Sequence, residues 1–112
     1  MSRPALRRLL TLEEAVRTAD TGGGRDETWQ ALGALWADVQ AVSAREVFEG
    51  ERPGARVTHR IIVRGAPVGA PSRPRPSQRF REGTRLFGIV AVSELDPMGR
   101  YLVCWAEEGR GL

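Results

Sequence analysis

His59 is the one side chain in the sequence that can act as a general base near neutral pH. It begins an alternating segment and follows three carboxylates, Glu46, Glu49 and Glu51, that can orient its ring. No nucleophile stands at a recognisable spacing from it, because Ser43 is better placed as the cap of a short helix. A lone histidine at the start of a strand is more often a hydrogen-bonded structural group. We therefore predict that His59 belongs to the scaffold.

The remaining groups that carry chemistry are few. Cys104 is the single cysteine, so an internal disulfide is excluded, and one cysteine with one histidine cannot build a metal cluster. Its place in the run YLVCWA is typical of a small buried hydrophobe. The adjacent glutamates Glu13–Glu14 and Glu107–Glu108 cannot share a substrate, because neighbours on a strand point to opposite faces. The sequence therefore predicts no catalytic residue, no metal site, no cofactor and no enzymatic activity.

Length and composition indicate one globular domain over residues 1–112. The chain is 41% hydrophobic and 28% charged, which is ordinary for a folded domain and unlike a disordered one. No apolar run approaches the roughly 20 residues that span a bilayer. The N-terminus begins basic, but Glu13 and Glu14 interrupt the apolar stretch that a signal peptide needs. We expect a protein made in the cytoplasm, with no membrane partner.

Charge is distributed unevenly along the chain. Residues 60–85 hold seven arginines and one acid, a net charge of +6, whereas the other 86 residues sum to −3. A basic stretch beside an acidic remainder favours contact with nucleic acid or head-to-tail contact between copies of the chain. The remaining alternative is a solvated face without a partner.

The first half of the chain predicts strands around a glycine turn. Residues 5–19 fit either a helical stripe or strand spacing, and their composition favours a helix. Three consecutive glycines make residues 20–27 a turn. Residues 28–42 are predicted to form a strand with apolar side chains on both faces, which indicates either a central strand or one face reserved for a partner. Its tryptophans are predicted to be core or interface anchors and not platforms for base stacking.

The second half predicts a short helix, strands and a long loop. Residues 43–51 form a helix with a capping box, and residues 55–65 alternate as a strand. Residues 65–79 hold four prolines and predict an extended, exposed, arginine-bearing loop. Residues 83–95 and 100–108 form a hairpin through the type I turn DPMG. The predicted fold is mostly β: a small antiparallel β-barrel or sandwich with one short helix and a long Pro/Arg-rich loop.

The order of three segments resembles the phage head-tail joining family, the head-closure or stopper proteins of tailed phages and gene transfer agents. The segments are TWQALGALWADVQAVSAREVFEG, VTHRIIVRG and RLFGIVAVSELDPMGRYLVCWAEE. They match the family pattern at Trp36, Ala37, Val39, Ser43, Arg45, Glu46, Val57, Thr58, His59, Arg60, Ile61, Phe87, Ile89, Asp96, Gly99 and Arg100. The likeness covers residues 20–108. Ala44 stands where the family has glycine, and the loop at 65–79 is longer and more basic than expected.

The resemblance implies a β-barrel protein with a first strand at residues 6–17. It also implies a ring beneath the portal and its adaptor that gates the DNA exit channel and offers a platform to the tail. The expected partners are copies of the chain in a ring of six or twelve, portal-side adaptor proteins, tail terminator or tail tube proteins, and packaged double-stranded DNA. The expected location is the virion or a phage-like particle.

The resemblance and the charge pattern together indicate the candidate site residues. Five residues are predicted to anchor strands or subunits: Trp36, Arg45, Glu46, His59 and Arg60. Five arginines are candidates for facing DNA or the channel, from segment 43–56 or loop 65–79: Arg52, Arg56, Arg73, Arg75 and Arg79. The alternative function is a free small β-barrel that binds nucleic acid. Its support is the pI of 10.3 and the arginine-rich loop; against it stands the lack of exposed aromatics among those arginines.

Overall fold

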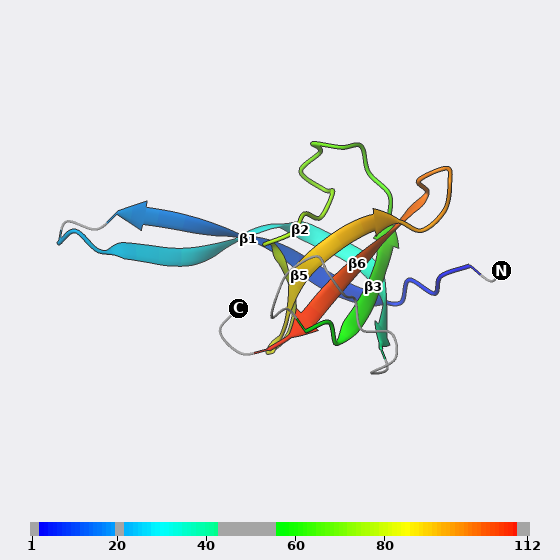
Figure 1. Cartoon of the computed structure of the whole chain (residues 1–112), viewed down its shortest axis with the longest axis horizontal. Helices are drawn as coiled ribbons and strands as arrows, with labels where there is room; N and C mark the ends of the chain where they lie inside the picture. Colours follow the sequence, from blue (N-terminus) through cyan, green and yellow to red (C-terminus); the bar gives the residue numbers. More distant parts are fainter. Residues whose placement is uncertain (1–2, 20–21, 43–55, 110–112) are drawn as a thin grey trace.

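In the computed structural model of the chain, which describes residues 3–19, 22–42 and 56–109, one antiparallel sheet closes on itself (Figure 1). Its strands are β1 (Arg8–Ala19), β2 (Arg25–Ala41), β3 (His59–Arg64), β4 (Arg79–Glu82), β5 (Arg85–Glu94) and β6 (Tyr101–Glu108). They form a closed barrel in the order β1-β2-β3-β6-β5-β4. The mostly-β prediction is confirmed. The predicted helix at 43–51 lies outside the described residues.

The core fills the inside of the barrel with the inward residues of each strand. Strand side chains alternate between two faces, and β1, β3, β5 and β6 each place apolar residues on the inner one. The core cluster is Leu10, Leu12, Ala37, Ile61, Val63, Phe80, Phe87, Ile89, Leu102, Cys104 and Ala106, each at most 2% exposed. Full burial of one large apolar side chain contributes about 1.5–3 kcal/mol. This core is therefore the main stabilising element of the closed sheet.

The helix favoured by composition at residues 5–19 is wrong, and the first strand implied by the family resemblance is confirmed. β1 pairs with β2 over its whole length, and also with β4 between Thr11 and Glu13. Leu10 and Leu12 face the core with period two. Helix propensity is worth a few tenths of a kcal/mol per residue, so pairing and burial outweigh it here.

The predicted strand at residues 28–42 is confirmed as β2, but its side chains do not alternate between the two faces without a break. The register between β1 and β2 shifts at Leu12/Glu13, where Leu12 faces Gly33 and Glu13 faces Ala31. Such a bulge changes which side chains face inward and bends the strand. Accordingly, Leu35 and Leu32 both pack against the core although they lie three residues apart.

The second half of the sheet agrees with the predicted strands. β3 buries Ile61 and Val63 as its alternation indicates. β5 and β6 pair as the predicted hairpin, and in the turn between them the Gly99 amide donates to the carbonyl oxygen of Asp96 at 3.0 Å. Gly99 adopts a φ of 65°, a conformation that glycine reaches without strain.

β4 and the loop before it differ from the prediction. β4 is four residues long, and sequence analysis placed its first residue, Arg79, at the end of the loop. The loop carries no strand from residue 65 to 78, as predicted, but it is not fully exposed: Pro74 and Gln78 are buried. The Gln78 side-chain oxygen accepts from the Arg75 amide at 2.8 Å, so the loop is folded onto its own backbone.

A two-stranded hairpin extends well beyond the barrel. β4 contacts β1 only as far as Glu13, and β3 contacts β2 only from Ala37 onward. Residues 14–19 and 25–31, here called the arm, therefore pair only with each other among the described residues. The arm projects from the barrel in Figure 1, and the molecule measures 55 × 29 × 26 Å. No helix in the described part of the chain is long and apolar enough to cross a membrane.

Candidate functional site

The arm is attached to the barrel by a partly buried ion cluster, here called the clamp, of Glu13, Arg79 and Arg81. Glu13 lies at the bulge and is 5% exposed. Its Oε1 accepts from Arg79 Nε at 2.7 Å and its Oε2 from Arg81 Nε at 2.8 Å. Burial acts to raise the pKa of Glu13, but the hydrogen bonds from the two arginines lower it below its usual value. The carboxylate therefore stays charged, and it joins β1 to β4 where the arm begins.

Trp29 adds a second attachment. The Arg79 guanidinium carbon lies 3.9 Å from the centroid of the Trp29 ring, a cation–π arrangement. Sequence analysis did not anticipate this contact between Trp29 and an arginine. The barrel thus holds both strands of the arm, through Glu13 on β1 and Trp29 on β2.

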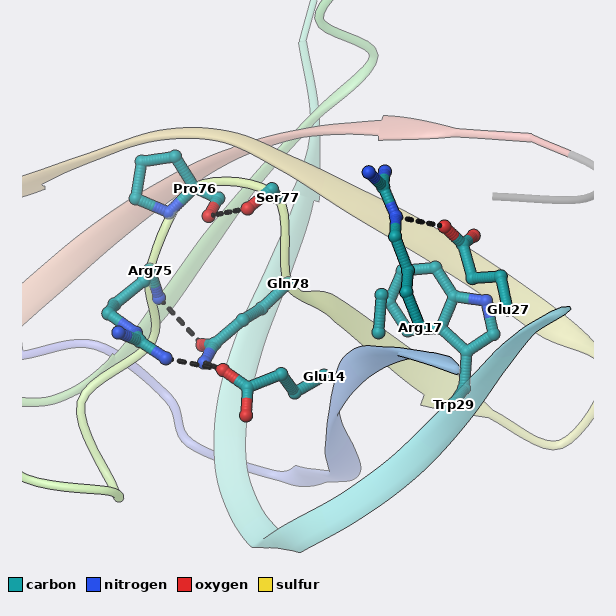
Figure 2. Close-up of a pocket in the computed structure, with 9 residues that line it drawn as sticks. Glu14, Arg17, Glu27, Trp29, Arg75, Pro76, Ser77 and Gln78 are labelled. Atoms are coloured by element: carbon teal, nitrogen blue, oxygen red, sulfur yellow. Dashed lines mark hydrogen bonds and ion pairs between the residues drawn. The ribbon is translucent and has the colours of Figure 1, made fainter. Parts of the chain in front are cut away.

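A groove with a volume of about 800 Å³ lies between the arm and the loop. Figure 2 shows its charged lining as two pairs, Glu14 with Arg75 and Arg17 with Glu27. Gln78 also donates to Glu14, at 3.3 Å. These groups neutralise one another within the chain. The groove is therefore a joint between arm and loop that carries no surplus charge for an ionic ligand.

Sequence reasoning missed the clamp and the joint. Neither Glu13 nor Glu14 was considered as a partner of the loop arginines. One signal was present: Glu13 follows Leu12 in an apolar strand, next to the core, where an acid needs a cationic partner. The partner was not identifiable from sequence, because Arg79 and Arg81 lie more than 60 residues away.

His59 belongs to a polar cluster at one end of the barrel, together with Arg8, Glu82, Arg85 and Glu108. The His59 Nδ1 lies 2.9 Å from Thr58 Oγ1, and its ring meets Phe87 edge-on at 5.1 Å between centroids. Its Nε2 lies 3.9 Å from Glu108. Arg85 in turn donates to Glu108, and Arg8 donates to Glu82. These contacts support the scaffold interpretation of His59.

The stability of the protein should depend on the protonation of His59. Desolvation lowers the pKa of His59 below 6.5, against the attraction of Glu108. The unfolded chain then binds the proton more readily, so stability present above pH 6.5 is lost as the pH falls through the folded-state pKa. The loss is about 1.4 kcal/mol for each pKa unit of difference. Urea unfolding at pH 7.5 and 5.5 should show this decrease in wild type and a smaller one in His59→Gln.

Between pH 5.5 and 7.5 the carboxylates contribute little, because the ordinary pKa values of Glu and Asp lie at 4.5 or below. Equal decreases in wild type and His59→Gln would show that the ring is not the titrating group.

A model of the phage head completion protein family matches residues 1–109. The chain belongs to this family. Family membership gives it a structural role in joining the head and tail of a phage or phage-like particle and places it in the virion.

Two solved structures agree with the family match over nearly the whole chain. A chain from the virion of a native gene transfer agent particle is 55% identical, with a TM-score of 0.74, 96% of this chain covered and 98% of that one. The solution structure of protein SF1141 from Shigella flexneri 2a is 26% identical, with a TM-score of 0.73 and full coverage of both chains. No curated protein matches the sequence.

In this head completion protein, the candidate DNA-facing arginines of the loop are largely paired within the chain. Arg75 pairs with Glu14 and Arg79 with Glu13. Arg73 donates to the carbonyl oxygen of Ala66 at 2.9 Å. Arg56 is exposed. Arg52 lies outside the described residues.

Of the residues predicted to anchor strands or subunits, those that the structure describes do not gather in one site of this head completion protein. Arg60 donates through Nε to the side-chain oxygen of Gln40 at 3.1 Å, which joins β3 to β2. Trp36 is 56% exposed on the outer face of β2, and no core contact explains so large an apolar side chain there. Arg45 and Glu46 lie outside the described residues.

Proposed function

We propose that the chain is the head-closure ring, or stopper, which joins the portal–adaptor complex to the tail and gates DNA exit. The observation that carries this proposal is the full-length match to a chain of a native gene transfer agent particle. The architecture supports it: a closed barrel with an arm fixed at its base offers surfaces for packing against other copies. Copies that meet head to tail through different surfaces close into a ring when the rotation divides a full turn.

The ring is proposed to hold six or twelve copies, with adaptor proteins on the portal side and tail terminator or tail tube proteins on the other. Double-stranded DNA passes through its channel in this proposal. Phosphate contacts by arginines are independent of sequence and weaken with salt. Arg56 suits this role better than Arg75 and Arg79, because those two are already paired with carboxylates.

The test is deletion of the gene in the producing strain, followed by electron microscopy of the particles and measurement of their DNA. We expect filled heads that lack tails and leak DNA, and we expect a plasmid copy of the wild-type gene to restore tailed particles. Normal tailed particles from the deletion strain would overturn the proposal.

The same experiment separates this function from free nucleic-acid binding. A free binder would leave tailed particles intact on deletion, and its purified monomer would bind DNA with an affinity that falls steeply as salt rises. A stopper acts only when assembled, so the purified monomer should bind DNA weakly even at low salt.

A further inference from the structure

Two apolar side chains form an exposed patch on the outer face of the barrel. Leu9 and Trp36 are direct partners in the β1–β2 register and are 48% and 56% exposed. Alternation places Arg7 on the same face as Leu9. Arg64 follows the Ala37–Val63 pair and so lies beside Trp36. Arg7 and Arg64 are exposed, and neither forms an ion pair with a described carboxylate. A tryptophan bordered by arginines has the composition of a protein-binding hot spot.

The second feature is the arm. Its base is fixed to the barrel, and beyond the base its strand edges have no strand partner among the described residues. The clamp and the Trp29–Arg79 contact fix its direction. Beyond this base, both edges of the ribbon lack a strand partner among the described residues. A two-stranded hairpin is only marginally stable without further packing, and its open edges invite pairing. The direction of the arm is fixed while its outer half has open edges. The arm is therefore suited to pack against another protein surface.

The two features lie at opposite ends of the same hairpin. The last residue of β1, Ala19, is ten positions beyond Leu9, about 33 Å at the rise of an extended strand. Glu27 on the outer half of the arm is already paired with Arg17. Asp26 is exposed there and forms no ion pair with a described side chain, whereas Arg7 and Arg64 border the patch, so the unpaired charges of the two surfaces are opposite in sign. A contact between two ends of one element in successive copies is heterologous, and it repeats from copy to copy around an axis.

From these observations we propose that the arm of each copy packs on the Leu9–Trp36 patch of the next copy around the ring. The partner is a second copy of this chain, and the contact combines burial of Trp36 with pairing of Asp26 to Arg7 or Arg64. This proposal rests on the ring function above and supplies its subunit interface.

Engineered disulfides test the contact in assembled particles. Thr28→Cys places a thiol on the arm and Ala34→Cys places one beside the patch; both positions are exposed. The two residues are six positions apart in one strand, about 20 Å, so they cannot form a disulfide within a chain. Native Cys104 gives little background, because burial raises the pKa of its thiol to about 12. Oxidised particles carrying both changes should show a ladder of covalent multimers on a non-reducing gel.

The matched controls are the two single-cysteine chains, which should remain monomeric. If the double-cysteine chain is incorporated at wild-type level and stays monomeric, the interface proposal is wrong while the ring function stands. A Thr28→Cys cross-link to a protein of different mass would overturn it as well, by assigning the arm to a neighbouring component. If wild-type chain is absent from purified particles, the proposed function itself fails.

A second variant checks the patch without cysteines. Trp36→Asp should reduce incorporation into particles on the order of tenfold or more, as expected for loss of a hot-spot tryptophan, while the purified chain keeps the wild-type melting temperature. Met98→Asp, at a side chain 74% exposed in the β5–β6 turn, is the control and should incorporate normally. Normal incorporation of Trp36→Asp would contradict the proposal.

Discussion

A Glu13→Gln chain should be less stable than wild type by about 3–5 kcal/mol, the usual effect of removing one partner from a buried ion pair. The substitution preserves the shape of the side chain but removes the charge that two guanidinium groups share. Arg79 has a side chain only 11% exposed and cannot turn to water without giving up its contact with Trp29. Its charge is then left without compensation beside the core. Urea unfolding at pH 7 measures the change.

Glu27→Gln is the matched control. It makes the same chemical change on the same hairpin, but the Arg17–Glu27 pair is exposed, at 70% and 43% of the two side chains. Exposed pairs contribute about 0–1 kcal/mol. Similar losses in the free energy of unfolding for Glu13→Gln and Glu27→Gln would show that the clamp stabilises the fold no more than an exposed ion pair does.

The clamp variant also bears on assembly. Without the Glu13 charge the arm loses its ion pairs to β4, and it keeps the Trp29–Arg79 contact and the weaker, exposed Glu14–Arg75 pair. Hydrogen exchange in the arm should then increase more than exchange in the β5–β6 hairpin. Because an interface between rigid bodies costs less entropy to form than one between flexible segments, a loosened arm would weaken packing against a neighbouring copy even at temperatures where the barrel remains folded.

The parts of the fold that the sequence predicted are those with a local signal. β3 was predicted from its alternation between apolar and polar residues, and the β5–β6 hairpin from its Asp-Pro-Met-Gly turn. β1 was predicted only through the family resemblance, because its Ala, Leu, Glu and Arg residues suit a helix and the physical evidence for a strand lies in its pairing with β2. β4 is too short to show a period, and it is a strand because it fits between β1 and β5.

The site was predictable to a smaller degree. Trp36 was named as an anchor because an apolar side chain on the second face of a strand needs a partner, and it is exposed in the monomer. The loop arginines were interpreted as DNA ligands from their charge density alone. The density of charge along the sequence shows how many arginines are present, but it does not show which carboxylates they pair with. Their partners Glu13 and Glu14 lie in another part of the sequence, so the cancellation of charge appears only in the folded chain.

Phe80→Ala should destabilise the protein by about 3–5 kcal/mol, the range for truncating a buried phenylalanine. Phe80 is fully buried and is paired with Leu12 of β1 on one side and Phe87 of β5 on the other. β4 is the strand that closes the barrel and it is four residues long. A cavity at Phe80 therefore weakens closure directly, and exchange of amide hydrogens should rise first along β1 and β4. Met98→Ala, at an exposed side chain, should change stability by no more than about 0.5 kcal/mol. If Phe80→Ala were as mild as Met98→Ala, closure of the sheet would depend on backbone pairing and not on the core, and the arm would be attached to a barrel that can open.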